Sequence, residues 1–196
     1  MIVFKFGGAS VKDAAGIKNL ASIVSEEKGN LMIVVSAFGK TTNALEKVLA
    51  TWLSGDKNYK DHLDNIYSYH ASVAEELFPL GNSAKKLIDN SFRQLRDYLS
   101  SSVKGAYDYE YDQVVSFGEV WSTLIVSEYL KKVNLKVEWT DIRRLLITDN
   151  RFRDANILWE KSEVQVKSHF NFERSPLFVT QGFIGGTETG KVSTLG

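Results

Sequence analysis

Two glycines, a lysine and a hydroxyl lie together near the start of the chain, in the stretch Lys5-Phe6-Gly7-Gly8-Ala9-Ser10. An apolar run before it predicts a short strand over residues 2–6. Glycine lets the backbone approach a ligand and adopt positive φ, and bare amides near a helix N-terminus bind anions. Lys5 adds a mobile positive charge. The stretch predicts a phosphate-binding loop, although it lacks the third glycine of G-x-G-x-x-G and leaves a plain glycine turn as an equal alternative.

A second loop with hydroxyl groups follows the next apolar run and reads Ser36-Ala37-Phe38-Gly39-Lys40-Thr41-Thr42. Its G-K-T letters resemble the end of a P-loop, but a P-loop needs a glycine where Val34 stands, so that interpretation is rejected. Ligands bind at the carboxyl ends of parallel strands, and we therefore expect the two loops to lie side by side. Ser36 and Thr42 are candidate ligand-binding hydroxyls, with helix capping as the alternative.

A glycine and a glutamate, Gly118-Glu119, stand inside an otherwise apolar helical pattern. Glycine costs a helix interior about 1 kcal/mol relative to alanine, so close approach by a ligand or another backbone would explain Gly118. If Glu119 faces inward, its carboxylate is costly unless it pairs with a cation such as a substrate ammonium. Periodicity slightly favours the alternative, an exposed Glu119. Asp141 and Arg143 are expected to orient a turn or to form an ion pair.

The composition is that of an ordinary globular protein with one domain, since 196 residues carry 43% hydrophobic and 24% charged side chains. Basic and acidic residues number 24 each, so no net field favours nucleic acid or an anionic membrane. No apolar run spans a bilayer. The lack of cysteine and of a signal-peptide pattern fits a cytoplasmic protein. The three histidines lack zinc-site spacing and are expected at the surface, so no protein metal ligand is predicted.

The elements that must position these residues form an α/β pattern, with an open, mostly parallel sheet sandwiched by helices. Asp13 is the expected N-cap of the first helix, and a right-handed βαβ unit follows from the first two strands. Residues 42–132 form a helical insertion, and residues 182–190 contain a hairpin turn. The expected strands are 2–6, 31–35, 135–140 and 178–183, and the expected helices are 14–27, 42–53, 59–77, 83–101 and 109–133.

Taken in order, these stretches resemble the aspartokinases of the amino acid kinase superfamily. The resemblance covers the whole chain. The motifs that carry it are the K-F-G-G-T-S-V strand and loop (residues 5–11, with Ala9 in place of threonine), V-V-S-A with a later threonine (34–37 and Thr42), the G-E pair (118–119), D-x-R (141–143) and the glycine-rich V-T-Q-G-F-I-G…T-L-G hairpin (179–185 and 194–196).

The resemblance implies an amino acid kinase fold and transfer of phosphate from MgATP to the β-carboxylate of L-aspartate, the first step toward lysine, threonine, methionine and isoleucine. It implies that Lys5, Gly7, Gly8 and Ser10 hold the ATP phosphates, with Lys5 catalytic. Ser36, Thr42 and Glu119 would line the aspartate pocket, with Glu119 pairing the α-ammonium. Mg²⁺ would be bound through the phosphates. The aspartate side chain is already ionised at neutral pH, with a reference pKa of about 3.9, so no general base is required.

Two departures from the family pattern affect these expectations. Ala9 removes a hydroxyl whose hydrogen bond to a phosphate would be worth about 1.5–3 kcal/mol, and Ser10 is the candidate replacement. The family continues after Gly196 with R-G-G-S-D, whose arginine holds the substrate carboxylate. We therefore expect this chain to be the N-terminal, truncated portion of one kinase domain, with the rest of that domain and the ACT domains absent.

The resemblance further implies that the parent protein is a homo-oligomer and that the fragment alone is inactive. Two alternatives remain. One is another amino acid kinase, with acetylglutamate, glutamate, carbamate or UMP as acceptor. The other is a phosphate- or nucleotide-binding module without catalysis.

Overall fold

A parallel four-stranded sheet forms the centre of the computed structural model, which describes residues 1–78, 83–101 and 104–196. Its strands run in the order β1 (Ile2–Phe6), β2 (Leu31–Val35), β5 (Leu177–Gln181) and β3 (Val137–Trp139), and every neighbouring pair is parallel. The unbroken apolar runs explain this arrangement, because β2 buries every second residue and β5 buries all five. The predicted α/β fold with a parallel sheet is confirmed.

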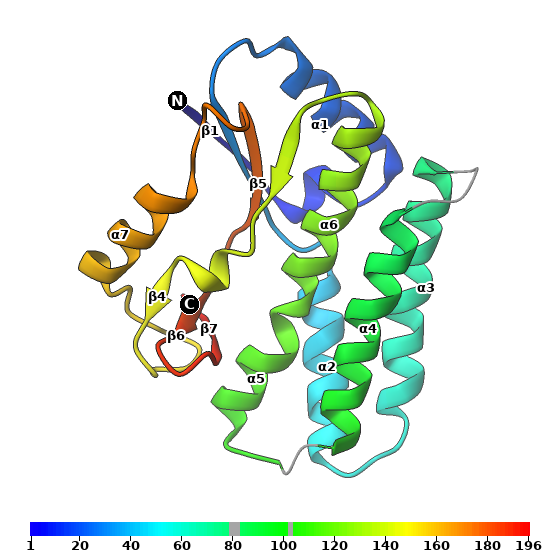
Figure 1. Cartoon of the computed structure of the whole chain (residues 1–196). Helices are drawn as coiled ribbons and strands as arrows, with labels where there is room; N and C mark the ends of the chain where they lie inside the picture. Colours follow the sequence, from blue (N-terminus) through cyan, green and yellow to red (C-terminus); the bar gives the residue numbers. More distant parts are fainter. Residues whose placement is uncertain (79–82, 102–103) are drawn as a thin grey trace.

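Helices pack against one face of this sheet, and a helical bundle extends beyond its carboxyl edge (Figure 1). The bundle corresponds to the predicted insertion. Asp13 caps the first helix as expected, since its Oδ1 accepts a hydrogen bond from Gly16 N at 2.8 Å. The helices are α1 (Ala14–Glu26), α2 (Thr41–Leu53), α3 (Tyr59–Leu77), α4 (Ser83–Ser101), α5 (Tyr107–Val115), α6 (Phe117–Lys132) and α7 (Trp159–His169). None of the helices in the described ranges is long and apolar enough to cross a membrane.

A smaller sheet lies beside the main one, in the order β4 (Ile147–Thr148), β6 (Ile184–Thr187) and β7 (Val192–Thr194). Strands β6 and β7 are antiparallel and form the predicted hairpin. Strand β6 lies within the glycine-rich stretch. Glycine is needed there because the strand passes very close to the turn at Arg143. A Cβ on Gly186 would lie 2.0 Å from the Arg143 carbonyl oxygen. The composition of this stretch predicted the turn and missed the strand.

Two helical predictions differ from the structure. The single helix expected over 109–133 is wrong, because the chain turns at Ser116 between α5 and α6. Helix α7 was missed, since it is mostly polar and buries Ser162 as its one buried residue. The Ser162 hydroxyl bonds both the amide and the carbonyl of Ile147, which are distant in sequence. Long-range contacts, invisible to periodicity, decide both differences.

His70 contradicts the prediction that the histidines lie on the surface. Its side chain is fully buried, stacked on Phe38 with ring centroids 5.5 Å apart and in edge contact with Trp121. Nδ1 donates to the Ile66 carbonyl at 2.8 Å, which leaves Nε2 bare and without a partner among the described atoms. Burial lowers the pKa of His70 from 6.5 to about 4. His62 and His169 are partly exposed.

We predict that His70→Phe makes the protein less sensitive to acid. The folded state resists protonating His70 until about pH 4, whereas the unfolded chain takes up the proton below 6.5. The wild type should therefore lose stability as pH falls across this window, by on the order of 2 kcal/mol. Urea unfolding at several pH values measures this loss. His62→Gln, on the same helix, is the control, and an equal acid loss in His70→Phe would contradict the assignment.

Candidate functional site

The two loops singled out by sequence meet at the carboxyl edge of the main sheet. Strands β1 and β2 are in register with Phe6 opposite Val35, so both loops begin at the same level. Ser36 N donates to the Phe6 carbonyl at 3.1 Å, and Gly39 N donates to the Gly8 carbonyl at 3.0 Å. The expected juxtaposition is therefore present, and backbone hydrogen bonds hold it.

The glycines of the first loop serve close approach rather than positive φ. Neither Gly7 nor Gly8 has a positive φ, which corrects one part of the expectation. A Cβ on Gly8 would lie 2.3 Å from the Ala37 carbonyl oxygen, so only glycine allows the second loop to come this close. Gly7 differs, because a Cβ added there would have no other atom within 4 Å. The backbone at Gly7 is the part of this loop that a ligand can reach.

The anion site expected at the N-terminus of the first long helix is not present in that form. A short 3₁₀ helix, η1 (Gly8–Val11), follows Gly7 directly, and α1 begins only after Asp13. The Asp13 carboxylate already accepts from an amide of the first turn of α1 and places a negative charge there. An anion at this edge would instead meet the Gly7–Ser10 segment.

Lys5 lies exposed on β1, one residue before the strand ends. The side chains of Phe4 and Phe6 pack against the core, so Lys5 leaves the strand on the opposite face of the sheet. We find no hydrogen bond or ion pair of Lys5 with any residue of the described ranges. Ser10 is likewise exposed and its hydroxyl has no described partner. Both groups are available to an external ligand at the sheet edge.

Neither Ser36 nor Thr42 caps a helix, although capping was an alternative for both. Helix α2 begins after Lys40 without a side-chain capping bond, and the Thr41 hydroxyl donates to the Phe38 carbonyl at 2.7 Å. Within the described chain the hydroxyls of Ser36 and Thr42 have no hydrogen-bond partner, and both residues are partly exposed. They remain free donors beside the first loop.

Glu119 faces inward, contrary to the alternative that periodicity slightly favoured. The residue is 3% exposed, and its Oε1 accepts a hydrogen bond from Ala37 N at 3.3 Å. Its Oε2 is buried without a hydrogen-bond partner among the described residues. Burial raises the pKa of Glu119 from 4.5 to about 7, because the hydrogen bond from Ala37 N only partly offsets the loss of solvent. A cation placed at Oε2 would restore the charged form.

Gly118 brings Glu119 to the second loop by close packing. A Cβ at this position would lie 2.9 Å from the Ala37 Cβ and 3.4 Å from Thr41 Cγ2. Because α6 begins at Phe117, Gly118 stands in the first turn of the helix rather than in its interior. The contact with another segment, one of the explanations expected from sequence, accounts for the glycine.

The exposed backbone at Gly7, three hydroxyls without a described partner, a lysine and an unpaired acid thus lie along one edge of the sheet. Amides and a lysine suit phosphate oxygens, and an acid without a partner suits an ammonium group. Sequence reasoning did not assign a role to Ala37, whose amide is the hydrogen-bond donor to Glu119. A backbone donor has no side-chain signature, so only the position of this loop could reveal it.

Comparison with known proteins decides the family, because the profile of the Amino acid kinase family matches residues 1–196. The chain belongs to the amino acid kinase family. Lysine-sensitive aspartokinase 3 of Escherichia coli is 29% identical to it over 201 residues, covering 100% of this chain and 43% of that enzyme. Chloroplastic aspartokinase 1 of Arabidopsis thaliana is 31% identical, covering 99% of this chain and 35% of the relative. The chain thus spans less than half the length of these relatives.

Solved structures of the E. coli enzyme share the fold of this chain. The complex of aspartokinase III with lysine and aspartate superimposes with a TM-score of 0.88 at 28% identity, over 100% of this chain and 44% of the other. The complex with aspartate and ADP gives 0.86 at 28% identity, over 100% and 43%. The family fold expected from the sequence motifs is therefore confirmed.

The D-x-R stretch forms a turn and an ion pair, as expected. Arg143 forms a two-pronged ion pair with Asp141, with Nε–Oδ1 and Nη2–Oδ2 distances of 2.8 and 2.7 Å. Asp141 Oδ1 also accepts from the Arg143 amide and caps the 3₁₀ helix η2 (Ile142–Arg144). Gln181 at the end of β5 holds the same turn, because its Oε1 accepts from Ile142 N at 2.8 Å.

We predict that Gly118→Ala destabilises the protein by about 1–3 kcal/mol, the usual cost of overpacking a tight contact. The added methyl would lie 2.9 Å from Ala37 Cβ, so the loop and α6 must separate. Urea unfolding measures the loss. Gly29→Ala is the matched control, since nothing lies within 4 Å of a Cβ there. Equal stability of the two variants would show that the contact is not tight.

We also predict that Glu119→Gln changes how stability depends on pH. The pKa of Glu119 is about 7 in the folded state, above the ordinary glutamate value of 4.5 that applies to the unfolded chain. Between these pH values the folded state therefore retains a proton that the unfolded chain releases. The wild type should therefore lose stability as pH rises from 4.5 to 7, and the glutamine variant should lose less. Urea midpoints across this range test the difference. Parallel curves for the two proteins would contradict a raised pKa.

Proposed function

We propose that this chain carries the phosphate- and aspartate-binding edge of an aspartate kinase, which transfers a phosphoryl group from MgATP to the β-carboxylate of L-aspartate. The observation that carries the proposal is the buried Oε2 of Glu119, which lacks a described partner and lies next to the Ala37 amide. The relatives support it, because both are aspartokinases and one of them has been solved with aspartate and ADP. The product would be 4-phospho-L-aspartate, the start of lysine and threonine synthesis.

The acceptor site is proposed to lie between the second loop and α6. The α-ammonium of aspartate would pair with Glu119 and remove the energetic penalty of its burial. The free hydroxyls of Ser36 and Thr42 would bind the carboxylates. The β-carboxylate needs no general base because it is ionised at neutral pH. The site's contribution is to position two anions and to stabilise the charge that develops between them.

The phosphate site is proposed to lie at the first loop. The backbone at Gly7 and Gly8 and the Ser10 hydroxyl would hold phosphate oxygens, whereas the Ser10 amide already donates to the Gly7 carbonyl at 2.9 Å. Lys5 would stabilise the transferring group. Lys5 must reach round the end of β1, since its side chain leaves the face opposite the core. Mg²⁺ would neutralise phosphate charge while bound to ATP oxygens.

The unpaired carboxylate also separates this proposal from the alternatives whose acceptor has no ammonium group, though not from glutamate. Acetylglutamate and carbamate carry no free ammonium, so neither would give Glu119 Oε2 a charged partner. The chain spans less than half of the related enzymes, and we propose that it forms the N-terminal part of a kinase domain in a homo-oligomeric parent. Groups elsewhere in that parent would complete the site.

We predict that two variants affect different kinetic constants in the longest natural protein that contains this chain. Glu119→Gln should raise the KM for aspartate about 10- to 100-fold, because it removes an ion-paired hydrogen bond made already in the ground state. Lys5→Met should lower kcat about 100-fold or more, because it removes a charge aimed at the transition state. A coupled assay of ADP release measures both.

Matched controls are Glu26→Gln and Lys28→Met, which change exposed residues at the end of α1 and after it. In the 196-residue chain alone the assay should show no turnover, whereas L-aspartate should bind more tightly than N-acetyl-L-aspartate in calorimetry. Equal binding of the two compounds, or wild-type KM in Glu119→Gln, would overturn the role proposed for Glu119.

A further inference from the structure

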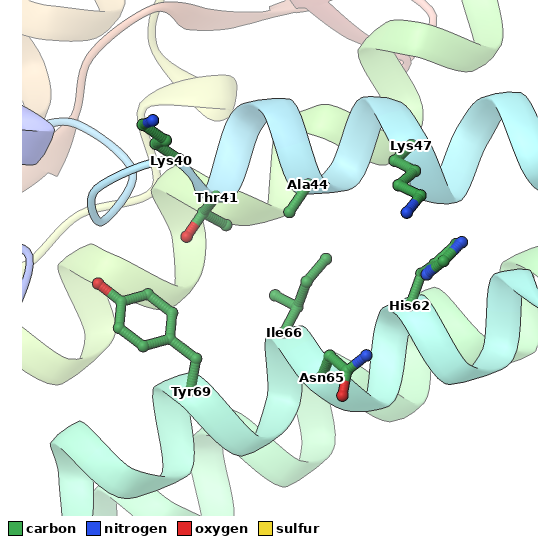
Figure 2. A pocket seen from close by; sticks show the side chains of 8 residues that line it. All are labelled: Lys40, Thr41, Ala44, Lys47, His62, Asn65, Ile66 and Tyr69. Carbon is green, nitrogen blue, oxygen red and sulfur yellow. The ribbon is translucent and has the colours of Figure 1, made fainter.

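A cavity of about 370 Å³ opens between α2 and α3 and extends from the start of α2 along the two helices (Figure 2). Its size suits a small molecule. Ala44 from α2 and Ile66 from α3 face each other across its middle and give it an apolar floor. None of the residues proposed to bind ATP phosphates or aspartate lines this groove, although Lys40 and Thr41 at one end belong to the second loop, so the groove adjoins the candidate site without being part of it.

The ends of the groove are positively charged or rich in donors. Lys47 and His62 point toward each other at one end, and Lys40 lies at the other (Figure 2). No acidic side chain is found among the described residues that line it.

Two acids on the helices that form the groove are engaged elsewhere. Glu46 on α2 accepts from the Tyr111 hydroxyl at 2.9 Å, and Asp64 on α3 pairs with Arg96 at 2.7 Å. No carboxylate therefore neutralises the lysines from inside the groove. An apolar middle between cationic ends fits a small organic anion.

We propose that this groove binds a small organic anion, with its apolar body between Ala44 and Ile66 and its phosphate or carboxylate against Lys47 and His62. The inference goes beyond the proposed function and does not depend on it.

Binding here would also act on the two loops of the candidate site through Tyr69. Tyr69 lines the groove, and its hydroxyl donates to the Lys12 carbonyl at the end of the first loop. Gly39 of the second loop packs on the same hydroxyl, which a Cβ would approach to 3.3 Å. Gly39 also has a φ of 51°, a conformation that is costly for other residues. A ligand that moves Tyr69 thus moves both loops, which makes the groove a regulatory site.

Phenyl phosphate is the probe, because it combines an apolar ring with an anion. We expect its titration into the ¹⁵N-labelled chain to produce saturable amide shifts at residues 44–47 and 62–69, and at Lys12 and Gly39. Inorganic phosphate and benzyl alcohol, which each carry one half of the chemistry, should bind more weakly. Absence of saturable shifts in the groove would overturn the site, and shifts that spare Lys12 and Gly39 would overturn the coupling to the loops.

Variants separate this site from the sheet edge. Lys47→Gln should raise the dissociation constant of phenyl phosphate roughly two- to fivefold, as expected for one exposed charge, while Lys47→Arg should retain the affinity. Lys86→Gln, an exposed lysine on α4, is the control. Lys5→Met should leave the groove shifts intact even though it removes the cation of the proposed phosphate site. Equal affinity of Lys47→Gln and wild type, or loss of the groove shifts in Lys5→Met, would contradict the assignment.

Discussion

The candidate site depends on how closely two segments, the first loop and the start of α6, approach Ala37. On one side the missing side chain of Gly8 admits the Ala37 carbonyl, and on another the missing side chain of Gly118 admits its methyl group. The Ala37 amide donates a hydrogen bond to the Glu119 carboxylate. Each contact would be blocked or lengthened by a single methyl group. Because closely packed segments cannot deform gradually, the two loops and the start of α6 behave as one unit.

This packing also explains how the chain can hold an acid in its interior. Glu119 has one weak backbone donor and one oxygen without a described partner, so burial raises its pKa to about 7. A fold optimised for stability alone would replace such a group with an apolar one. Its presence at the edge where two glycine-containing loops meet is what connects the fold to ligand binding.

The helical insertion provides the rigid support behind these loops. Phe92 stacks on Trp121 with centroids 3.6 Å apart, and His70 lies between this pair and Phe38 of the second loop. The loop therefore rests on buried rings from α3, α4 and α6. The ring of the neutral His70 packs like an aromatic side chain, while its Nδ1–H donates to the Ile66 carbonyl of the same helix.

Local interactions were readable from the sequence, and long-range burial was not. Apolar runs predicted β1 and β2, and Asp13 was predicted to cap the first helix. The ion pair of Asp141 with Arg143 was also expected. Each of these signals lies within a few residues of the chain. The inward position of Glu119, the burial of His70 and the break at Ser116 were decided by tertiary structure. The bond from Ala37 to Glu119 joins residues 82 positions apart, and no periodicity reports which face of a helix a distant loop will cover.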